Sequence, residues 1–456
     1  MLFLCSGALW KKDESPVLAF CIGYQWLFVM IGYIYYLITG RFLASNPGDV
    51  EGAVFLSMLG FLVMTVGIRL AFKAMRTLSR KSSLRRENSE PYNIKYIFWI
   101  IILLYVINWF IEINPYRFFG LTQLFDQMLS FRSVFLVLLF LEIASQGKGY
   151  IYGIGAASFF FLPTAAGSLL SAWSTLFFML FLVFISEWKP WLKTPIMRMR
   201  NKKILTGAVG AAVILCTLGL IWQGGGVKGS WRRSLSMEVE HVKPIEKMGI
   251  LGGLVKEGTL QFDFQGDYLS LIERMSGVYV FTQVLDYVPK VISHEQGRLT
   301  WRAIEHALKP RFLFPDKPGL GSNSSLVIKY TGYWVAGEES GTSIGLTYMA
   351  EFYVDYGKIG MFIPLFFWGL LIGLTYRLFF VFSPSHRFAC AAVITAYLQP
   401  FASYEGEIAY LLGGLGLVFL TYGTLLLFLG SWFHRLLRLN SVGSRVKHAL
   451  SQGLEP

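Results

Sequence analysis

The chain has 456 residues, of which 54% are hydrophobic and 15% are charged, and its formal net charge is +13. This composition is typical of a protein embedded in a bilayer and argues against a soluble globular fold. The positive charge does not require a nucleic-acid partner, because basic loops beside anionic lipid explain it. The four cysteines lie in or beside apolar runs and predict neither a disulfide framework nor a thiolate metal site. They are Cys5, Cys21, Cys216 and Cys390.

Apolar runs recur along the chain, and most are long enough to cross roughly 30 Å of hydrocarbon as a helix. They lack the alternating pattern of a transmembrane barrel, so helices must satisfy their backbone groups. The sequence therefore predicts an all-α, polytopic transmembrane bundle of about ten spans. The first run has no small-residue cleavage site and is expected to be a retained helix. The predicted spans are 17–40, 53–74, 96–113, 131–146, 150–165, 168–186, 204–222, 358–382, 388–404 and 408–432.

Basic residues predict the orientation of these spans. If the spans alternate, all the basic loops fall on one side of the membrane, which the positive-inside rule assigns to the cytoplasm together with both termini. The chain then divides into a first bundle, one large extracytoplasmic loop between the seventh and eighth spans, a second bundle and a basic cytoplasmic tail. The boundaries of these parts are 1–223, 224–342, 343–433 and 434–456.

The large loop carries nearly balanced charges, with 14 lysines and arginines against 13 aspartates and glutamates. It therefore lacks the positive bias of the other loops. Apolar residues at helical spacing predict a helix over 267–288 and a shorter one over 300–310 that ends at Pro310. We expect this loop to fold over one end of the bundle.

The stretch "KPRFLFPDKPGLGSN", 309–323, is a polar loop made rigid by three prolines. Such a loop would hold Arg311 and Lys317 in place. The planar fork of an arginine and the compact charge of a lysine suit a lipid phosphate or diphosphate. The alternative is an ordinary salt bridge between Arg311 and Asp316 or a nearby glutamate.

A second stretch, "GEESGTSIGLTYMAEFYVDYGKIGMF" (337–362), leads into the eighth predicted span. Glu351 follows a run of small and apolar residues and approaches the membrane, where an ionisable group is costly and more often functional. It is the preferred candidate for a general base, with Glu339 as the alternative. A structural role, in which Glu351 caps a helix or pairs with a loop arginine, remains open. Asp355 is expected to be a solvated charge at the membrane interface.

Aromatic and basic residues of the large loop and its flank complete the candidate site. Aromatic rings can stack on sugar faces, although anchoring at the membrane interface is the more frequent reason for outer Trp and Tyr. No metal-binding or nucleotide-binding motif occurs, so no cofactor is predicted. The candidate substrate-binding residues are Lys317, Arg302, Tyr333, Trp334 and Tyr353.

At "PRFLFPDKP" (310–318) and "GTSIGLTYMAEFYVDYGKIGMF" (341–362), the sequence resembles the oligosaccharide repeat unit polymerases, the Wzy-type O-antigen and exopolysaccharide polymerases. The resemblance implies a glycosyltransferase of the bacterial cytoplasmic membrane that joins polyprenyl-diphosphate-linked repeat units on its outer face. Glu351 or Glu339 would act as the base and Arg311 would stabilise the diphosphate. Expected partners are the lipid-linked oligosaccharide, membrane lipids, a chain-length regulator and a flippase.

Two other functions stay open at this point. A transporter of polysaccharide or lipid-linked glycan would show charges in mid-span or internal repeats, whereas here the charges gather in one outer loop and its flanks. A non-catalytic component of a synthesis complex could lose the cations of that loop without loss of function. The charge distribution favours an active site on the outer face.

Overall fold

The computed structural model describes residues 1–10, 15–42, 48–76, 91–113, 122–164, 169–187, 264–309, 313–314, 316–317, 319, 323–335 and 345–438. All regular elements in these ranges are helices, so the all-α prediction is confirmed for them. The helices are α1 (Leu2–Leu9), α2 (Val17–Thr39), α3 (Val50–Ala74), α5 (Ile94–Ile113), α6 (Thr122–Ser130), α7 (Arg132–Gln146), α8 (Tyr150–Thr164), α9 (Leu169–Glu187), α13 (Phe264–Met275), α14 (Val278–Tyr287), α15 (Arg298–Leu308), α16 (Asn323–Thr331), α17 (Tyr348–Gly360), α18 (Phe362–Phe382), α19 (His386–Ala402) and α20 (Ile408–Leu436).

Nine of the ten predicted spans correspond to helices, and the remaining one, 204–222, lies outside the described residues. Six helical segments of the described chain are long and apolar enough to cross a membrane, which supports a multi-pass membrane protein. The count of ten spans stays a prediction. The six segments are Val17–Thr39, Val50–Ala74, Ile94–Ile111, Leu124–Gln146, Phe362–Phe382 and Ile408–Leu436.

The structure corrects three details of the predicted elements. The helix expected over 267–288 is two helices, α13 and α14, which are separated at Ser276 and Gly277. The span expected from 358 begins instead at Phe362, after a break at Gly357, where φ is 73°. The apolar helix α1 was not predicted, and it packs against α2 and α3.

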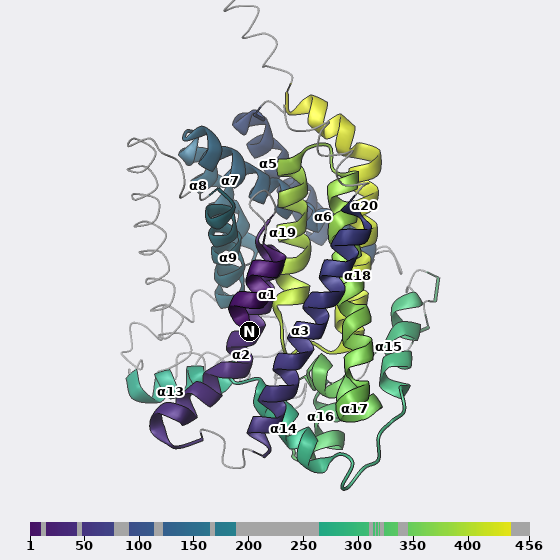
Figure 1. Ribbon diagram of the computed structural model, residues 1–456. Coiled ribbons are helices and arrows are strands. Elements are labelled where there is room, and N and C mark those ends of the chain that lie inside the picture. The colour runs from purple at the N-terminus through teal and green to yellow at the C-terminus, as the bar shows by residue number, and fades with distance from the viewer. Residues whose placement is uncertain are drawn as a thin grey trace, which may run out of the picture.

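Helix α19 lies at the centre of the bundle, in contact with α2, α7, α9, α18 and α20 (Figure 1). Its sequence is rich in small residues, and four alanines along it are fully buried. Small side chains let neighbouring helices approach closely. Close packing is the main source of helix association in lipid, because lipid tails are as apolar as the side chains. The four are Ala389, Ala391, Ala392 and Ala396.

Helices α3 and α18 pack against each other over much of their length, and glycines make the contact close. A Cβ atom on Gly67 would lie 2.4 Å from the carbonyl oxygen of Phe366, and one on Gly373 would lie 2.8 Å from that of Ile68. Gly369, four residues before Gly373, meets the backbone of α3 in the same way. This small-xxx-small spacing is typical of helix contacts in membranes.

Described residues beside three of the basic loops and the basic tail meet at one end of the bundle, which we call the basic end. The N–H of Asn93, before α5, donates to the carbonyl of Leu437, after α20, over 3.1 Å. Gln146, at the end of α7, donates to the carbonyl of Tyr92 over 2.9 Å, and the Tyr92 hydroxyl donates to Ser385 between α18 and α19 over 2.8 Å. Chain segments far apart in sequence therefore meet at this end.

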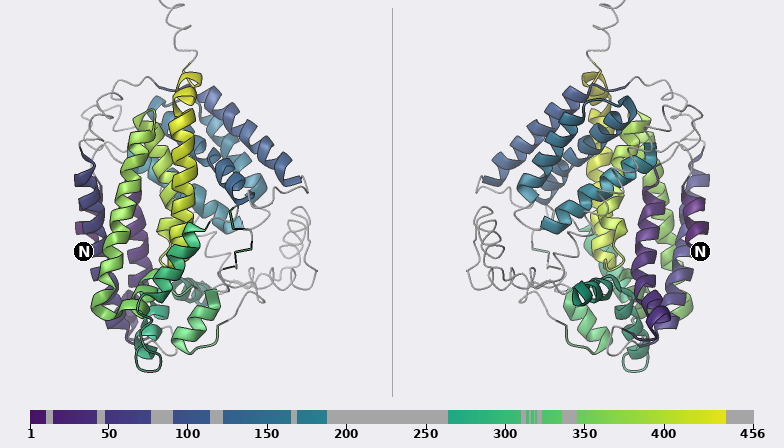
Figure 2. Two further views of the ribbon diagram at one scale, coloured as in Figure 1. Left: turned by 90° about the vertical axis from the view of Figure 1, so that its right-hand side faces the viewer. Right: turned by 90° about the vertical axis from the view of Figure 1, so that its left-hand side faces the viewer.

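The opposite end is covered by α13, α14, α16 and α17, and α15 runs along the first turns of α20 (Figures 1 and 2). We call α13–α17 the cap. The predicted short helix at 300–310 is confirmed as α15, from Arg298 to Leu308. The cap and the basic end are thus separated by the length of the apolar helices.

We expect the two ends to face opposite sides of the membrane. In a variant whose four cysteines are replaced, Lys148→Cys at the basic end and Ser293→Cys in the cap place thiols at exposed positions. A membrane-impermeant maleimide added to intact cells should label Ser293→Cys, and should label Lys148→Cys only after permeabilisation. Labelling of both from the same side would contradict the predicted topology.

Candidate active site

The turn between α19 and α20, "SYEGE" (Ser403–Glu407), meets the first turns of α17 beneath the cap. Glu351 from α17 and Glu407 from the turn lie close together here, and the Glu405 side chain of the same turn lies beside Gly277, before α14. Glu407 is the N-cap residue of α20, so its side chain lies beside the positive end of a helix of 29 residues. Helix geometry therefore places several carboxylates at one end of the apolar bundle.

Glu351 is buried, with 3% of its surface exposed. Both carboxylate oxygens lie 3.4 Å from the N–H of Ile408, the first residue of α20, which donates to them. Burial raises the pKa of Glu351 well above its usual range, and the nearby Glu407 raises it further, because the ionised form loses hydration and meets a like charge. The contact with the first residue of α20 has the geometry of the helix-capping role that the sequence leaves open for Glu351.

Glu407 is also buried, with 5% exposed, and it lies close enough to Glu351 to repel its charge. The N–H of Leu346 donates to its carboxylate, and Oε1 has no hydrogen-bond partner among the described residues. Burial raises the pKa of Glu407 to about 7, while the Leu346 N–H and the positive charge of Arg302 oppose that rise. A carboxylate with a pKa near neutrality can both accept and release a proton under physiological conditions.

Two arginines of the cap stabilise the ionised carboxylates. The positive charge of Arg302 on α15 opposes the rise in the pKa of Glu407, and that of Arg274 on α13 opposes the rise in the pKa of Glu405. Both arginine side chains are exposed, as is that of Glu405. The site therefore places buried carboxylates beside cations at the surface, an arrangement suited to a reaction that moves a proton and stabilises an anionic group.

Asp355 does not have the solvated position predicted for it. Its side chain is 1% exposed and accepts hydrogen bonds from Leu299 N–H over 3.0 Å, from Thr300 N–H over 2.7 Å and from the Thr300 hydroxyl over 2.6 Å. These donors lie in the first turn of α15, whose backbone N–H groups have no partner within the helix. Asp355 thus caps α15 from α17 and fixes the helix that carries Arg302.

A buried polar network fixes the other side of α17. Gln25 on α2 donates to the carbonyl of Phe401 and accepts from the hydroxyl of Tyr348 over 2.6 Å. The hydroxyls of Ser57 and Tyr404 lie 2.9 Å apart. Because each of these groups is buried and paired, they hold α2, α3, α17 and the α19–α20 turn in one arrangement.

The remaining predicted residues have different surroundings. Tyr353 is buried and donates to the carbonyl of Val288 over 2.8 Å. Lys317 donates to the carbonyls of His306 and Lys309 at the end of α15, so it binds the loop to that helix. Tyr333 and Trp334 are 41% and 80% exposed on the cap. Their substrate-binding roles, and that of Arg302, stay predictions.

Arg311 and Glu339, predicted as catalytic, lie outside the described residues. The structure brings Glu351 and Arg302 to the same region, because each interacts with Glu407. Sequence reasoning missed Glu405 and Glu407. The available signal was a pair of carboxylates in a five-residue turn between two apolar runs on the predicted outer side.

In the part of the chain that the structure describes, no group of three or more His, Cys, Asp or Glu side chains is placed to hold a metal ion.

One family model matches the chain, a domain of unknown function (DUF8712), over residues 230–400. The matched region includes the cap and Glu351 and ends before Glu405. No curated protein and no solved structure matches the chain. The comparisons therefore supply no function, and the chemistry of the site is the basis for one.

We expect Asp355→Ala to destabilise the protein by about 1–3 kcal/mol, because the variant leaves the buried donors of Leu299 and Thr300 without their acceptor. The measurement is the apparent Tm of the detergent-solubilised protein. Asp316→Ala, which removes an exposed carboxylate of the cap, is the control and should leave the Tm unchanged. An equal Tm in the two variants would show that Asp355 does not secure α15.

The raised pKa of Glu351 also predicts how stability depends on pH. The folded protein holds this proton more tightly than the unfolded chain, in which glutamate has a pKa of about 4.3. Between the unfolded and folded pKa values the folded state binds more protons, so the free energy of unfolding falls as pH rises.

Glu351→Gln should flatten this dependence and raise the apparent Tm at pH 8, because glutamine mimics the protonated acid. A gain of about 1 kcal/mol corresponds to at least about 2 °C in proteins of a few hundred residues. Glu273→Gln on α13, where the side chain is exposed, is the matched control. A lower Tm of Glu351→Gln at pH 8 would mean that the buried carboxylate is ionised and stabilising.

Proposed function

We propose that this protein polymerises polyprenyl-diphosphate-linked oligosaccharide repeat units, with its active site beneath the cap. The observation that carries the proposal is the pair of buried carboxyls, Glu351 and Glu407, whose pKa values are raised beside an arginine at one end of a membrane bundle. The resemblance at 310–318 and 341–362 supports the same reaction. The proposed location is the bacterial cytoplasmic membrane, with the cap outside and both termini in the cytoplasm.

In this reaction, a hydroxyl of one lipid-linked repeat unit attacks the anomeric carbon of the glycan carried by another. A C–O bond forms to the acceptor oxygen, and the C–O bond to the diphosphate breaks. The hydroxyl proton passes to a carboxylate, and the diphosphate leaves with the bonding electron pair. The reaction thus needs one base and fixed cations, and no nucleotide sugar.

Glu407 is the group best suited to accept the proton. Its pKa of about 7 leaves it substantially ionised near neutral pH, and Oε1 has no hydrogen-bond partner among the described residues. Glu351 is buried and is repelled by Glu407, and both effects favour its protonated form. When one carboxyl of a pair stays protonated and the other ionises, the ionised one can serve as the base. In this proposal Glu407 is the base, and Glu351 and Glu339 are the alternatives.

Arg302 and Arg311 are proposed to stabilise the departing diphosphate. Arg302 acts on Glu407, so an anion near its guanidinium would also lie near the base. Charge-assisted hydrogen bonds of this kind contribute about 1.5–3 kcal/mol each. The lipid tails would lie against the apolar helices, and a flippase and a chain-length regulator are the expected partners.

A transporter is the alternative function, and polymer length distinguishes the two. Purified protein in lipid nanodiscs would be supplied with polyprenyl-diphosphate repeat units, and the products separated on a gel. A ladder of longer glycans is the expected result. A polymerase needs no second compartment, so absence of a ladder in nanodiscs, combined with uptake of repeat units in sealed vesicles, would favour transport.

We expect Glu407→Gln to lower the rate of chain extension by about 10²–10⁴-fold, the usual contribution of a general base. In the unaltered protein the rate should rise with pH and level off above about pH 7, where Glu407 is ionised. Glu305→Gln on α15, an exposed carboxylate, should retain the rate and the pH profile. A normal rate in Glu407→Gln would assign the base to Glu351 or Glu339, and each can be tested by the same substitution.

A further inference from the structure

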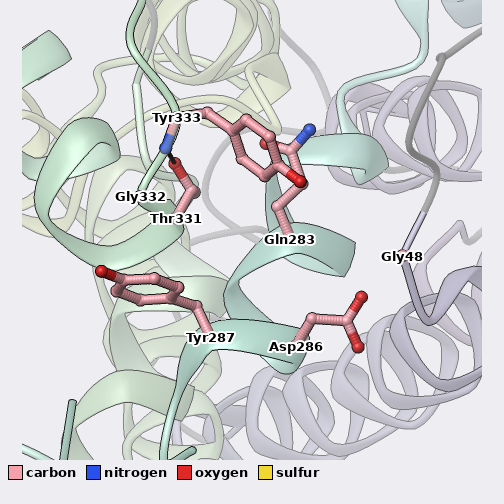
Figure 3. A pocket seen from close by; sticks show the side chains of 7 residues that line it. All are labelled: Gly48, Gln283, Asp286, Tyr287, Thr331, Gly332 and Tyr333. Atoms are coloured by element: carbon pink, nitrogen blue, oxygen red, sulfur yellow. Dashed lines mark hydrogen bonds between the residues drawn. The ribbon is translucent and has the colours of Figure 1, made fainter. Parts of the chain in front are cut away.

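A pocket of about 250 Å³ opens on the cap, away from the carboxyl pair just described (Figure 3). It lies between α14, the end of α16 and Gly48, two residues before α3. The volume is below the range of about 300–1,000 Å³ typical of sites for drug-sized ligands, so it suits a single ring. Its lining residues are Gly48, Gln283, Asp286, Tyr287, Thr331, Gly332 and Tyr333.

Two tyrosine rings form part of the wall. Figure 3 shows Tyr287 and Tyr333 on the same side of the pocket, with Gln283 beside the Tyr333 ring. Tyr333 is held in position because its N–H donates to the hydroxyl of Thr331 over 3.2 Å, and this hydroxyl donates to the carbonyl of Val327 over 2.7 Å. Exposed tyrosines offer an apolar face and a polar edge, which together match the C–H face and the hydroxyls of a pyranose.

Two glycines keep the pocket open. Gly332 has φ 72°, and a Cβ atom there would lie 2.7 Å from Cε2 of Tyr287. Gly48 has φ 63°, and a Cβ atom there would lie 2.7 Å from Oδ2 of Asp286. Both positions therefore favour glycine for conformation and for space. The backbone at Gly332 lies in close contact with the Tyr287 ring, and the backbone at Gly48 lies in close contact with the Asp286 carboxylate.

The charge of the described lining disfavours an anionic ligand. Among the described residues that line the pocket, Asp286 has the one charged side chain, and Lys290 lies outside the lining with its ammonium 3.6 Å from the carboxylate. A phosphate or diphosphate would meet a carboxylate here, whereas sugar hydroxyls can donate to Asp286 and exchange hydrogen bonds with the amide of Gln283. The ligand chemistry is therefore neutral and rich in hydroxyls.

We propose that this pocket binds one neutral pyranose ring of a glycan chain. The assignment of that ring to the growing or accepting glycan rests on the proposed function, but the chemistry of the pocket does not. The pocket would hold sugar while the diphosphate lies at the cations of the cap, because the two parts of such a substrate have opposite electrostatic requirements. Tyr333, which the sequence suggested as a substrate-binding residue, would then bind substrate as part of this pocket.

The test uses the full chain in lipid nanodiscs and a panel of neutral reducing oligosaccharides, with saturation-transfer NMR as the readout. At least one member should bind saturably, and inorganic pyrophosphate should not displace it. Tyr333→Ala should weaken binding by about two- to tenfold, the loss expected when an aromatic contact is removed. Asp286→Asn keeps the shape of the side chain and should also weaken binding, because amide hydrogens replace an acceptor.

Tyr268→Ala on α13 is the matched control, because this tyrosine is 46% exposed on the cap and does not line the pocket. It should bind the oligosaccharide as the unaltered protein does. The proposal is overturned if no member of the panel binds, if pyrophosphate competes, or if Tyr333→Ala and Asp286→Asn both bind normally. Glycan binding without chain extension would support the sugar-binding pocket and contradict the polymerase function. Chain extension without glycan binding would support the polymerase function and contradict the sugar-binding pocket.

Discussion

The close contact between α3 and α18 is the constraint on which the cap end of the molecule depends. Within lipid, apolar side chains gain little by leaving their surroundings, so helices associate through tight packing. Gly67 and Gly369 let the two backbones meet, and α17 continues directly into α18. Helix α14 packs against α3 as well. A helix contact inside the bundle thus determines where the carboxylates of α17 and the pocket beside α14 lie.

The second constraint is the cost of carboxylates that are buried near a membrane. Glu351 and Glu407 share the positive end of α20, which favours negative charge, but they also repel each other. Burial raises both pKa values, the charge of Glu407 raises that of Glu351 further, and the arginine on α15 limits the rise at Glu407. The position of that arginine depends in turn on Asp355, which caps α15 from the same helix that carries Glu351. Structural and chemical roles are therefore divided between two acids four residues apart.

Much of the bundle could be predicted from sequence because the bilayer requires long apolar helices. That requirement is local, so hydropathy alone predicted the helices now seen as α2, α3 and α20. The roles of the carboxylates depend on distant contacts. Nothing in the sequence near Asp355 indicates that its carboxylate accepts hydrogen bonds from Leu299 and Thr300, which lie more than fifty residues earlier in the chain. Glu407 in a short turn has the pattern of a solvated charge, and only the packing of α17 and the cap buries it.

The cap separates two kinds of chemistry that a lipid-linked glycan would require together. The described lining of the pocket beside α14 has aromatic rings and a carboxylate, whereas α15 and the loop after it contribute the cations Arg302 and Lys317. A sugar chain and a diphosphate differ in the same way, because one is neutral and the other anionic. Binding at two sites would orient the glycosidic bond between them, and orientation supplies a large part of catalysis in group transfer. Since both sites belong to helices fixed on α17 and α3, their spacing would be set by the bundle and not by the substrate.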